Sequence, residues 1–347
     1  MSWYRTYRPN QIADLHLTEV RETLQALLKK GWLPQVILFA GPRGTGKTST
    51  ARILSALVNT PANKESVSRA FSSKSNHKDA DQPLVEPNYT DELVARIKKG
   101  QALNVFELDA ASHRGIDDIR LLKDRVYLPP SEGVFSVVIL DEVHMLTTEA
   151  FNALLKLLEE PPAHALFVLA TTEIQKVPAT VLSRCFTIPF SKASVAELVS
   201  ALQMIVEKEQ ITHDLAGLQL IANQADGSFR DAVKLAEQLA HELPDLLEGT
   251  LTSRLLGHLD EQLRQLLLAI VAKEAEKVVT LFTAWRNDNV PAAQIERKFL
   301  ALLHEMITTS VLQTGIPLLP DRVALFLMNQ FIDSNLSLPS PIPLLPL

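Results

Sequence analysis

Residues 41–48 have the sequence Gly-Pro-Arg-Gly-Thr-Gly-Lys-Thr and satisfy every fixed position of the pattern G-x-x-x-x-G-K-[ST]. The apolar residues 35–40 before this run predict a buried strand, and residues 48–58 after it predict a helix. Glycines let the backbone of such a loop curl so that its N–H groups point at phosphate oxygens beside a positive helix N-terminus. The run therefore predicts a phosphate-binding loop in an α/β domain. The alternative is a glycine-rich turn that binds no ligand.

Individual residues of this segment have expected roles. Lys47 is expected to reach the β- and γ-phosphates of a nucleotide, and the Thr48 hydroxyl is expected to hold Mg²⁺. The nucleotide-binding residues expected here are Gly41, Pro42, Arg43, Gly44, Thr45, Gly46, Lys47, Thr48 and Ser49.

Four further apolar runs predict strands at residues 104–109, 134–141, 165–171 and 185–190. Helical patterns lie between them. In one of these, at residues 149–160, Phe151, Leu154, Leu155 and Leu158 share one apolar face, and Pro161-Pro162 ends the helix. Strands that alternate with helices predict a five-stranded parallel sheet covered on both faces.

The remaining chain predicts helical domains. The expected boundaries are a nucleotide-binding α/β domain at 1–178, a helical domain at 179–243, a third, all-helical domain at 244–335 and a Pro-rich tail at 336–347. The second domain contains helical patterns at 194–210, 213–224 and 228–243. The polar, aperiodic residues 61–90 predict a long loop inserted in the first domain.

Composition narrows the class of protein. Of 347 residues 46% are hydrophobic and 21% charged, which fits two or three globular domains. The single cysteine, Cys185, excludes an internal disulfide and a multi-cysteine metal site. Because no uncharged apolar run reaches about 18 residues and no signal-peptide core is present, we expect a cytosolic protein without a membrane partner. The net charge of −6 neither requires nor excludes nucleic acid.

Two carboxylates follow the apolar strand that ends at residue 141. Asp141 is expected to hold Mg²⁺, mainly through water, and Glu142 to orient the water that attacks the γ-phosphate. Thr172, at the end of the next predicted strand, is a candidate polar sensor of the γ-phosphate, although its position suits a strand-end cap equally well. We interpret His144 as a local hydrogen-bonding or interface residue outside the site.

Several motifs together resemble one family. They are residues 43–52, Leu108-Asp-Ala-Ala-Ser112, residues 141–146, residues 150–156, Leu158-Glu-Glu-Pro-Pro162, Leu182-Ser-Arg-Cys185 and Gly227-Ser-Phe-Arg-Asp-Ala232. With Tyr4 they span about two thirds of the chain. The chain resembles the gamma/tau subunits of the bacterial DNA polymerase III clamp loader, which are AAA+ ATPases. The resemblance implies an AAA+ domain, a helical lid and a helical oligomerisation collar, with ATP and Mg²⁺ as ligands.

The resemblance also implies roles for residues outside the loop. Arg184 matches the family's arginine finger, which acts in trans on the nucleotide of a neighbouring subunit. Thr172 matches the first sensor and Arg230 the second, which lets the lid detect the γ-phosphate. Tyr7, Arg8 and Pro9 match the segment beside the adenine.

Two departures from the family pattern are visible. Residues 61–100 contain none of the four zinc-binding cysteines that the family usually carries, so we expect a short form without zinc. The segment Leu15-His-Leu-Thr-Glu19 replaces the usual Val-Gly-Gln-Glu, which leaves the adenine contacts there open.

The function implied is that of an ATP hydrolase that loads a sliding clamp on primed DNA within the DNA polymerase III complex, without polymerase chemistry of its own. The implied partners are delta, delta-prime and further gamma/tau copies in a pentamer, the clamp and primer-template DNA. Sequence-independent DNA contacts are expected from 113–115 and 116–127, with Arg120, Lys123 and Arg125; a solvated helical face explains these charges equally well. The alternatives are another DNA-associated AAA+ ATPase and a non-catalytic stator subunit of the loader.

Overall fold

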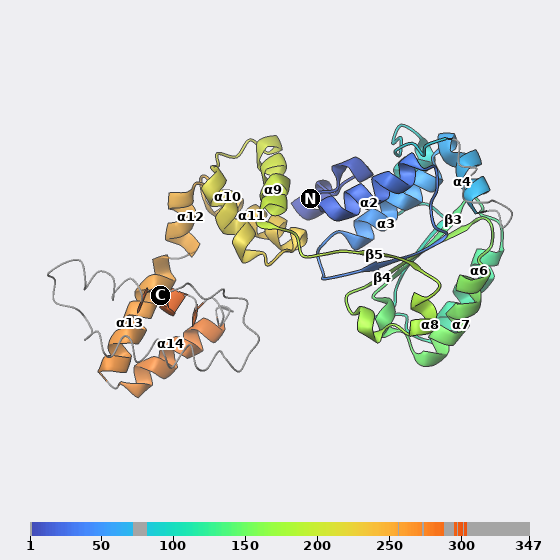
Figure 1. Ribbon diagram of the computed structural model, residues 1–347. Helices are drawn as coiled ribbons and strands as arrows, with labels where there is room; N and C mark the ends of the chain where they lie inside the picture. The colour runs from blue at the N-terminus through green and yellow to red at the C-terminus, as the bar shows by residue number, and fades with distance from the viewer. Residues whose placement is uncertain are drawn as a thin grey trace, which may run out of the picture. The chain divides into compact units, whose positions relative to one another are not determined.

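The structure, a computed structural model, describes residues 2–71, 82–255, 257–272, 274–287, 295–296, 298–300 and 302–303. It divides into two compact units, Met1–Glu248 and Gly249–Leu347 (Figure 1). The first unit contains every residue that the sequence assigns to nucleotide binding.

A five-stranded parallel sheet forms the centre of the first unit, with the strand order β2-β3-β4-β1-β5. The strands are β1 (Val36–Ala40), β2 (Val105–Asp109), β3 (Ser136–Asp141), β4 (Ala165–Thr171) and β5 (Phe186–Pro189). In the register of the sheet, Ala40 pairs with Thr171 and Asp109 pairs with Asp141. The loops that follow β1, β3 and β4 therefore leave the sheet at the same edge. The five-stranded parallel sheet confirms the predicted fold class.

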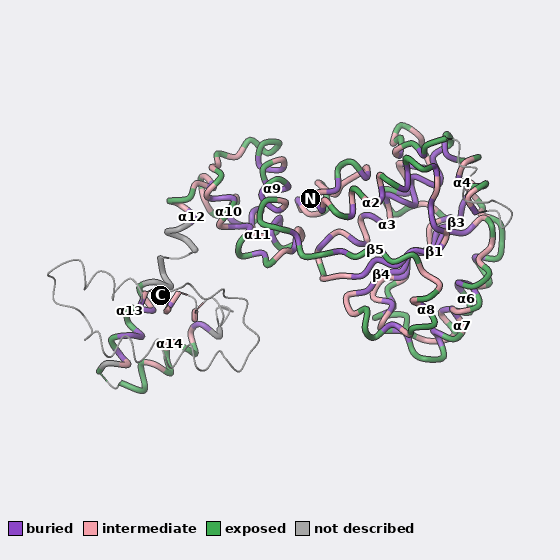
Figure 2. Tube along the Cα trace, in the orientation of Figure 1, coloured by how far each residue is buried: buried purple, intermediate pink, exposed green. Residues whose placement is uncertain are grey.

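Helices cover both faces of this sheet, which is why its central strands are continuous apolar runs. On one face, α6 (Ile116–Tyr127) and α7 (Thr148–Glu159) share a hydrophobic cluster with alternate residues of β1, β3 and β4. On the other face lies α3 (Lys47–Val58), near α2 (Thr18–Lys29) (Figure 1). As a result, β1 and β4 are buried along their whole length (Figure 2).

Short elements complete the first unit around these layers. They are α1 (Trp3–Thr6), η1 (Ile12–Asp14), η2 (Pro61–Asn63), α4 (Lys64–Ala70), α5 (Glu92–Lys98), η3 (Val143–Met145), η4 (Ile174–Lys176) and α8 (Ala179–Leu182).

The helix α4 corrects the prediction that residues 61–90 form a long loop. Its side chains at Lys64, Glu65 and Arg69 are exposed, whereas Val67 is fully buried. The Asn63 side chain, also buried, donates hydrogen bonds to the carbonyls of Leu57 and Val85. A short helix with one buried residue looks polar in sequence, because most of its surface faces solvent. Residues 72–81 of the same segment lie outside the described residues.

Three helices, α9 (Val195–Lys208), α10 (Leu215–Gln224) and α11 (Phe229–Glu242), follow the sheet in the first unit. Each begins with a side-chain cap, since Ser194, Asp214 and Ser228 accept hydrogen bonds from backbone N–H groups three residues later. Glu237 of α11 also binds the Ser2 hydroxyl and the Trp3 amide. The helical domain is thus tied to the N-terminal segment.

The second unit is helical where it is described. The helix α12 (Glu248–Leu255) spans the division between the units, and α13 (Gly257–Val271) packs on α14 (Ala275–Asn287). Their cluster includes the fully buried Trp285, whose indole N–H donates to Gln262 Oε1 at 2.6 Å. Most of the predicted third domain after residue 287 and the whole tail 336–347 lie outside the described residues. No helix in the described ranges is long and apolar enough to cross a membrane.

Candidate functional site

The loop between β1 and α3 has the backbone conformation that its glycines allow. Gly46, the N-cap of α3, has φ = 103°, and Gly44 has φ = 80°, both in the left-handed region. A Cβ added to Gly44 would lie 2.1 Å from the Ser228 hydroxyl oxygen, so another residue there would displace the start of α11. The loop therefore curls around the N-terminus of α3, where partial positive charge favours an anion.

Lys47 lies inside this curl. Its ammonium donates to the carbonyl oxygens of Gly41 and Pro42, at 2.7 Å each, and the residue is 6% exposed. Burial lowers the pKa of Lys47, whereas the nearby charges of Glu142 and Asp141 act in the opposite direction. The ammonium is thus held at the mouth of the loop by neutral groups, which a phosphate oxygen can replace.

The two residues expected to hold Mg²⁺ are in direct contact. The Thr48 hydroxyl donates to Asp141 Oδ2 at 2.7 Å, and the backbone N–H of Glu142 donates to Asp141 Oδ1 at 2.9 Å. A hydroxyl and a carboxylate at the N-terminal end of α3 are hard oxygen donors, which is the donor set that Mg²⁺ prefers. The residues present therefore fit the metal.

Glu142 lies beside this pair in an unusual conformation. It has φ = 49° and ψ = 43°, in the left-handed region that few residues other than glycine adopt. Its carboxylate accepts a hydrogen bond from the Thr172 hydroxyl at 2.9 Å. The structure therefore brings the predicted water-orienting residue and the predicted first sensor together.

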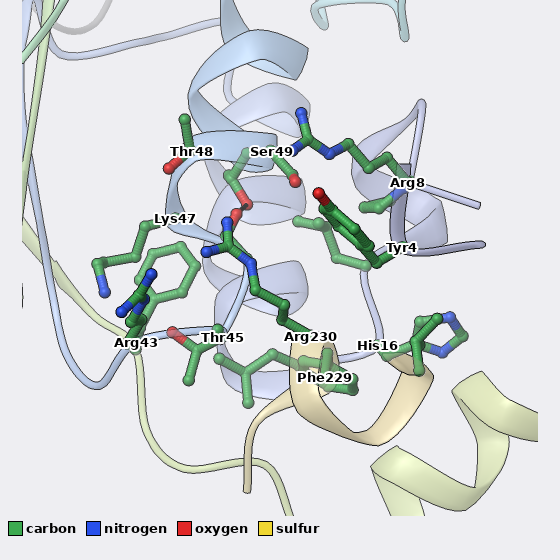
Figure 3. A pocket seen from close by; sticks show the side chains of 18 of the residues that line it. Tyr4, Arg8, His16, Arg43, Thr45, Lys47, Thr48, Ser49, Phe229 and Arg230 are labelled. Carbon is green, nitrogen blue, oxygen red and sulfur yellow. Dashed lines mark hydrogen bonds between the residues drawn. The ribbon is translucent and has the colours of Figure 1, made fainter. Parts of the chain in front are cut away.

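A cavity of about 480 Å³ opens beside the loop. Its lining includes the predicted residues Tyr7, Arg8, Pro9, Arg43, Gly44, Thr45, Gly46, Lys47, Thr48, Ser49, Asp141, Glu142 and Arg230. Figure 3 shows that Arg230 extends from α11 toward the loop that carries Lys47 and Thr48. The Arg230 backbone N–H also lies 3.4 Å from the Gly44 carbonyl oxygen. The helical domain and the phosphate loop are therefore two walls of one cavity.

Part of the cavity lining is apolar or aromatic, and sequence reasoning missed these residues. His16 and Phe229 have ring centroids 6.0 Å apart, and Met204 and Ile205 also line the cavity. Burial lowers the pKa of His16, and the charge of Arg21 acts in the same direction. The only sequence signal that pointed to these lining residues was the departure of residues 15–19 from the family pattern.

The Tyr4 side chain adds a second aromatic group, near the predicted residues Tyr7 and Arg8. The Arg230 guanidinium lies 6.0 Å from the centre of its ring, and the Lys234 ammonium lies 5.4 Å from it. Burial lowers the pKa of Arg8, and the charges of Arg52 and Arg230 add to this effect. The cavity lining thus includes both aromatic and cationic side chains, the kinds of group that bind a base and its phosphates.

Arg184 is absent from the lining of this cavity. It follows α8, where its guanidinium forms an ion pair with Glu159 of α7 and donates to the Thr180 carbonyl oxygen at 2.5 Å. Its Nε is buried and has no hydrogen-bond partner among the described residues. The adjacent Cys185 is packed against the core, and burial raises the pKa of its thiol to about 12. Arg184 is therefore held by contacts with α7 and α8, next to a cysteine that packs against the core.

Two of the three cations on α6 that are predicted to contact DNA have partners on that helix. Arg120 pairs with Asp117 at 3.1 Å, and both side chains are exposed. The Lys123 ammonium lies 5.9 Å from the centre of the Tyr127 ring. DNA binding by α6 stays a prediction.

Comparison with known proteins identifies the relatives of this chain. Residues 17–194 match the family described as DNA polymerase III, delta subunit, and residues 197–240 match the DNA polymerase III clamp loader subunit ATPase lid domain. The chain is 39% identical over 246 residues to DNA polymerase III subunit tau of Bacillus subtilis, which covers 71% of this chain and 40% of that protein.

Shorter relatives align over most of their length. DNA polymerase III subunit gamma of Buchnera aphidicola subsp. Baizongia pistaciae is 32% identical over 78% of this chain and 68% of the relative. The corresponding subunit of Buchnera aphidicola subsp. Acyrthosiphon pisum is 31% identical over 88% of this chain and 80% of the relative. The chain spans about two fifths of the length of the long tau subunits that it matches. With a phosphate loop, an acidic strand end and a helical lid in one unit, this chain belongs to the gamma/tau family of DNA polymerase III clamp-loader subunits.

Proposed function

We propose that the chain is an ATPase motor subunit of a replicative clamp loader, which couples ATP binding and hydrolysis to the loading of a sliding clamp on primed DNA. The observation that carries this proposal is the cluster of Lys47, Thr48, Asp141 and Glu142 around one end of the cavity. A subunit that only braced the assembly would not need an ammonium in the loop and a paired hydroxyl and carboxylate beside it.

The phosphates would enter the loop at the N-terminus of α3, where Lys47 exchanges its carbonyl partners for phosphate oxygens. Thr48 and Asp141 would hold Mg²⁺, which supplies charge neutralisation on the β- and γ-phosphates. Glu142 directly follows Asp141, and its backbone N–H donates to the Asp141 carboxylate. Its role would be to accept a hydrogen bond from the attacking water and so orient it, while Thr172 fixes the carboxylate.

The apolar part of the cavity would take the adenine, between His16, Phe229 and the Tyr7-Arg8-Pro9 segment. Arg230 would make the position of the lid depend on whether a γ-phosphate is bound, because it belongs to α11 and its guanidinium faces the loop. A ligand shifts a conformational equilibrium only by its differential affinity for the two states. ATP would therefore favour the lid position in which Arg230 and the loop share the phosphates.

Arg184 would complete the site of a neighbouring subunit. An arginine finger stabilises transition-state charge, and supplying it in trans makes hydrolysis depend on assembly. The partners proposed from the family are delta, delta-prime and further gamma/tau copies in a pentameric ring, the sliding clamp and primer-template DNA bound without sequence preference. We place this activity in the bacterial cytoplasm.

The test is ATP hydrolysis by the chain together with its cognate loader subunits, measured with and without sliding clamp and primed DNA. We expect clamp and primed DNA together to stimulate the rate. Hydrolysis that neither component changes would contradict the clamp-loader role. A chain that binds ATP in the assembled ring without hydrolysing it would instead be a stator subunit.

A further inference from the structure

The His144 side chain is buried next to the Glu142 carboxylate, and it has no part in the function proposed above. His144 belongs to η3, and its side chain is 5% exposed. Its Nδ1 is 3.5 Å from Glu142 Oε2 and 3.0 Å from the Thr171 hydroxyl, and its Nε2 is 3.4 Å from Glu173 Oε1. The ring therefore lies between two carboxylates, one at the site and one outside it.

The outer carboxylate is itself fixed. Glu173 pairs with Lys176 at 2.8 Å, and its backbone N–H donates to the Thr171 hydroxyl at 3.0 Å. The hydrogen bond from Lys176 lowers the pKa of Glu173, with help from the charges of Lys176 and His144. An ionised carboxylate accepts hydrogen bonds only, so each ring nitrogen can hold the carboxylate that faces it only while that nitrogen carries a proton.

The carboxylate on the other side of the ring belongs to Glu142. Glu142 directly follows β3 and has a left-handed backbone conformation. Thr172 donates to Oε2 of this carboxylate, and Nδ1 of His144 faces the same oxygen. One oxygen is thus surrounded by two groups of the protein, whereas Oε1 has no hydrogen-bond partner among the described residues. The arrangement leaves Oε1 available to a water molecule.

We propose that His144 is a positioning residue for Glu142, which holds Oε2 of the carboxylate in place and so directs Oε1 toward the reacting water. This inference depends on the proposed function, because it assigns His144 to the hydrolytic step. It also replaces our interpretation of His144 as a residue outside the site. Thr171 and Glu173 each contact a nitrogen of the ring, and the segment that contains them continues through η4 to α8 and Arg184.

Two substitutions distinguish the contribution of Nδ1 from that of Nε2. The amide nitrogen of His144→Asn occupies the position of Nδ1 and can still donate toward Glu142. That of His144→Gln reaches the position of Nε2 and retains only the contact with Glu173. His144→Ala removes both. Because misplacement of a catalytic group by about 1 Å can cost up to about a hundredfold in rate, we expect His144→Ala to lower kcat at least about tenfold. His144→Asn should recover most of this loss, and His144→Gln should not.

The test measures kcat and KM for ATP in the loader assembled from the full chain, with clamp and primed DNA, and separately the affinity of the variants for ATP. The affinity should stay within about twofold of wild type, because His144 acts on a group that orients water. His241→Ala, at the exposed end of α11, is the control for loss of an imidazole far from Glu142. Thermal unfolding checks that each variant folds.

A second measurement does not depend on turnover. The imidazole ¹⁵N resonances of His144, assigned by their loss in His144→Gln, should shift in the nucleotide-free chain when Glu142 or Glu173 is changed to Gln. If the resonances stay in place in both variants, the contacts that carry the inference do not exist in solution.

Each outcome has a distinct meaning. Unchanged kcat in His144→Ala, or a better recovery by His144→Gln than by His144→Asn, overturns the positioning role while wild-type hydrolysis leaves the proposed function intact. A kcat that rises in His144→Ala also overturns it, since His144 would then restrain the reaction. A wild-type chain that binds ATP in the assembled loader without hydrolysing it overturns both.

Discussion

At the scale of single residues, the site depends on a few polar contacts made where three strands end. Lys47, Thr48, Asp141, Glu142 and Thr172 come from distant parts of the sequence, and the parallel sheet brings them together. Motif spacing predicts these residues because the chemistry fixes their types. It does not predict how they touch one another, which depends on the conformation of Glu142.

The first prediction concerns Lys47. In Lys47→Ala, ATP affinity should fall about tenfold to a hundredfold, because a hydrogen bond to a charged group contributes about 1.5–3 kcal/mol. Equilibrium titration of the assembled ring with a fluorescent ATP analogue measures this loss. Arg43→Ala, which removes a neighbouring cation from the cavity lining, is the matched control and should lose less affinity. Equal losses in the two variants would mean that only the net charge of the loop matters.

The second prediction concerns Glu142. We expect Glu142→Gln to bind ATP normally and to hydrolyse it at least about a hundredfold more slowly, because the amide cannot act as the general base. Single-turnover hydrolysis in the assembled ring separates this effect from binding. Normal hydrolysis by the variant would assign the water-orienting role to another group.

The third prediction follows from the buried imidazole of His16. Its pKa in the folded chain lies below the ordinary value, so the unfolded state binds the proton more tightly. The free energy of unfolding should therefore be fully retained above about pH 6.5 and decrease as the pH falls below that value. Denaturant unfolding of wild type and His16→Gln between about pH 7.5 and 5.5 measures it. The variant should show the shallower pH dependence, and identical slopes would contradict this assignment.

At the scale of elements, α11 matters because it begins at the phosphate loop. Ser228 caps this helix by accepting the N–H of Asp231 at 3.2 Å, and the same hydroxyl occupies the space that a side chain on Gly44 would need. Arg230 then enters the cavity from the first turn. A single serine thus sets where the helix starts and how near Arg230 comes to the loop.

The fourth prediction compares two helix caps. Ser228→Ala and Thr147→Ala, the latter at the start of α7, each remove one cap and should each lower the free energy of unfolding by about 1 kcal/mol. Only Ser228→Ala should also weaken ATP binding, because α7 does not line the cavity. Denaturant unfolding and nucleotide titration of both variants test this. If both variants change ATP affinity equally, the start of α11 has no special role in nucleotide sensing.

The elements also explain what sequence could and could not predict. The three central strands β1, β3 and β4 were predictable because burial on both faces makes continuous apolar runs, and α7 was predictable from its one-sided periodicity. The helix α4 was not, since Val67 is the one residue within it that is buried. Tyr4, His16 and Phe229 share a cavity although they come from three separate segments. No local pattern marks residues that meet only through tertiary packing.

At the scale of the whole molecule, the proposed catalytic site would be shared between two neighbouring subunits. The first unit contains the cavity, and Arg184 lies outside its lining, beside the C-terminal ends of α7 and α8. A finger that does not reach its own cavity is consistent with action on a neighbour. The proposed ring therefore joins one subunit's cavity to the next subunit's Arg184.

The fifth prediction tests this arrangement. Arg184→Ala should bind ATP normally and hydrolyse it in its own cavity when a wild-type neighbour supplies the arginine, yet fail to activate that neighbour. Rings mixed from Arg184→Ala and Lys47→Ala chains assign each defect to one side of an interface, with wild-type rings as the reference. A variant that still stimulates wild-type neighbours would refute action in trans.

The ion pair between Arg184 and Glu159 has a consequence for how such a ring turns over. In the single chain the guanidinium already has an anionic partner, so docking against a neighbour exchanges one anion for another. The free energy of docking is then the difference between two ion pairs, one between Arg184 and Glu159 and one between Arg184 and the neighbour's anion. Because the Glu159 side chain is exposed, the first ion pair contributes little. A near-balanced exchange is easily reversed. In the proposed ring, neighbouring subunits would therefore be able to separate Arg184 from the adjacent site after each round of hydrolysis without leaving the ring.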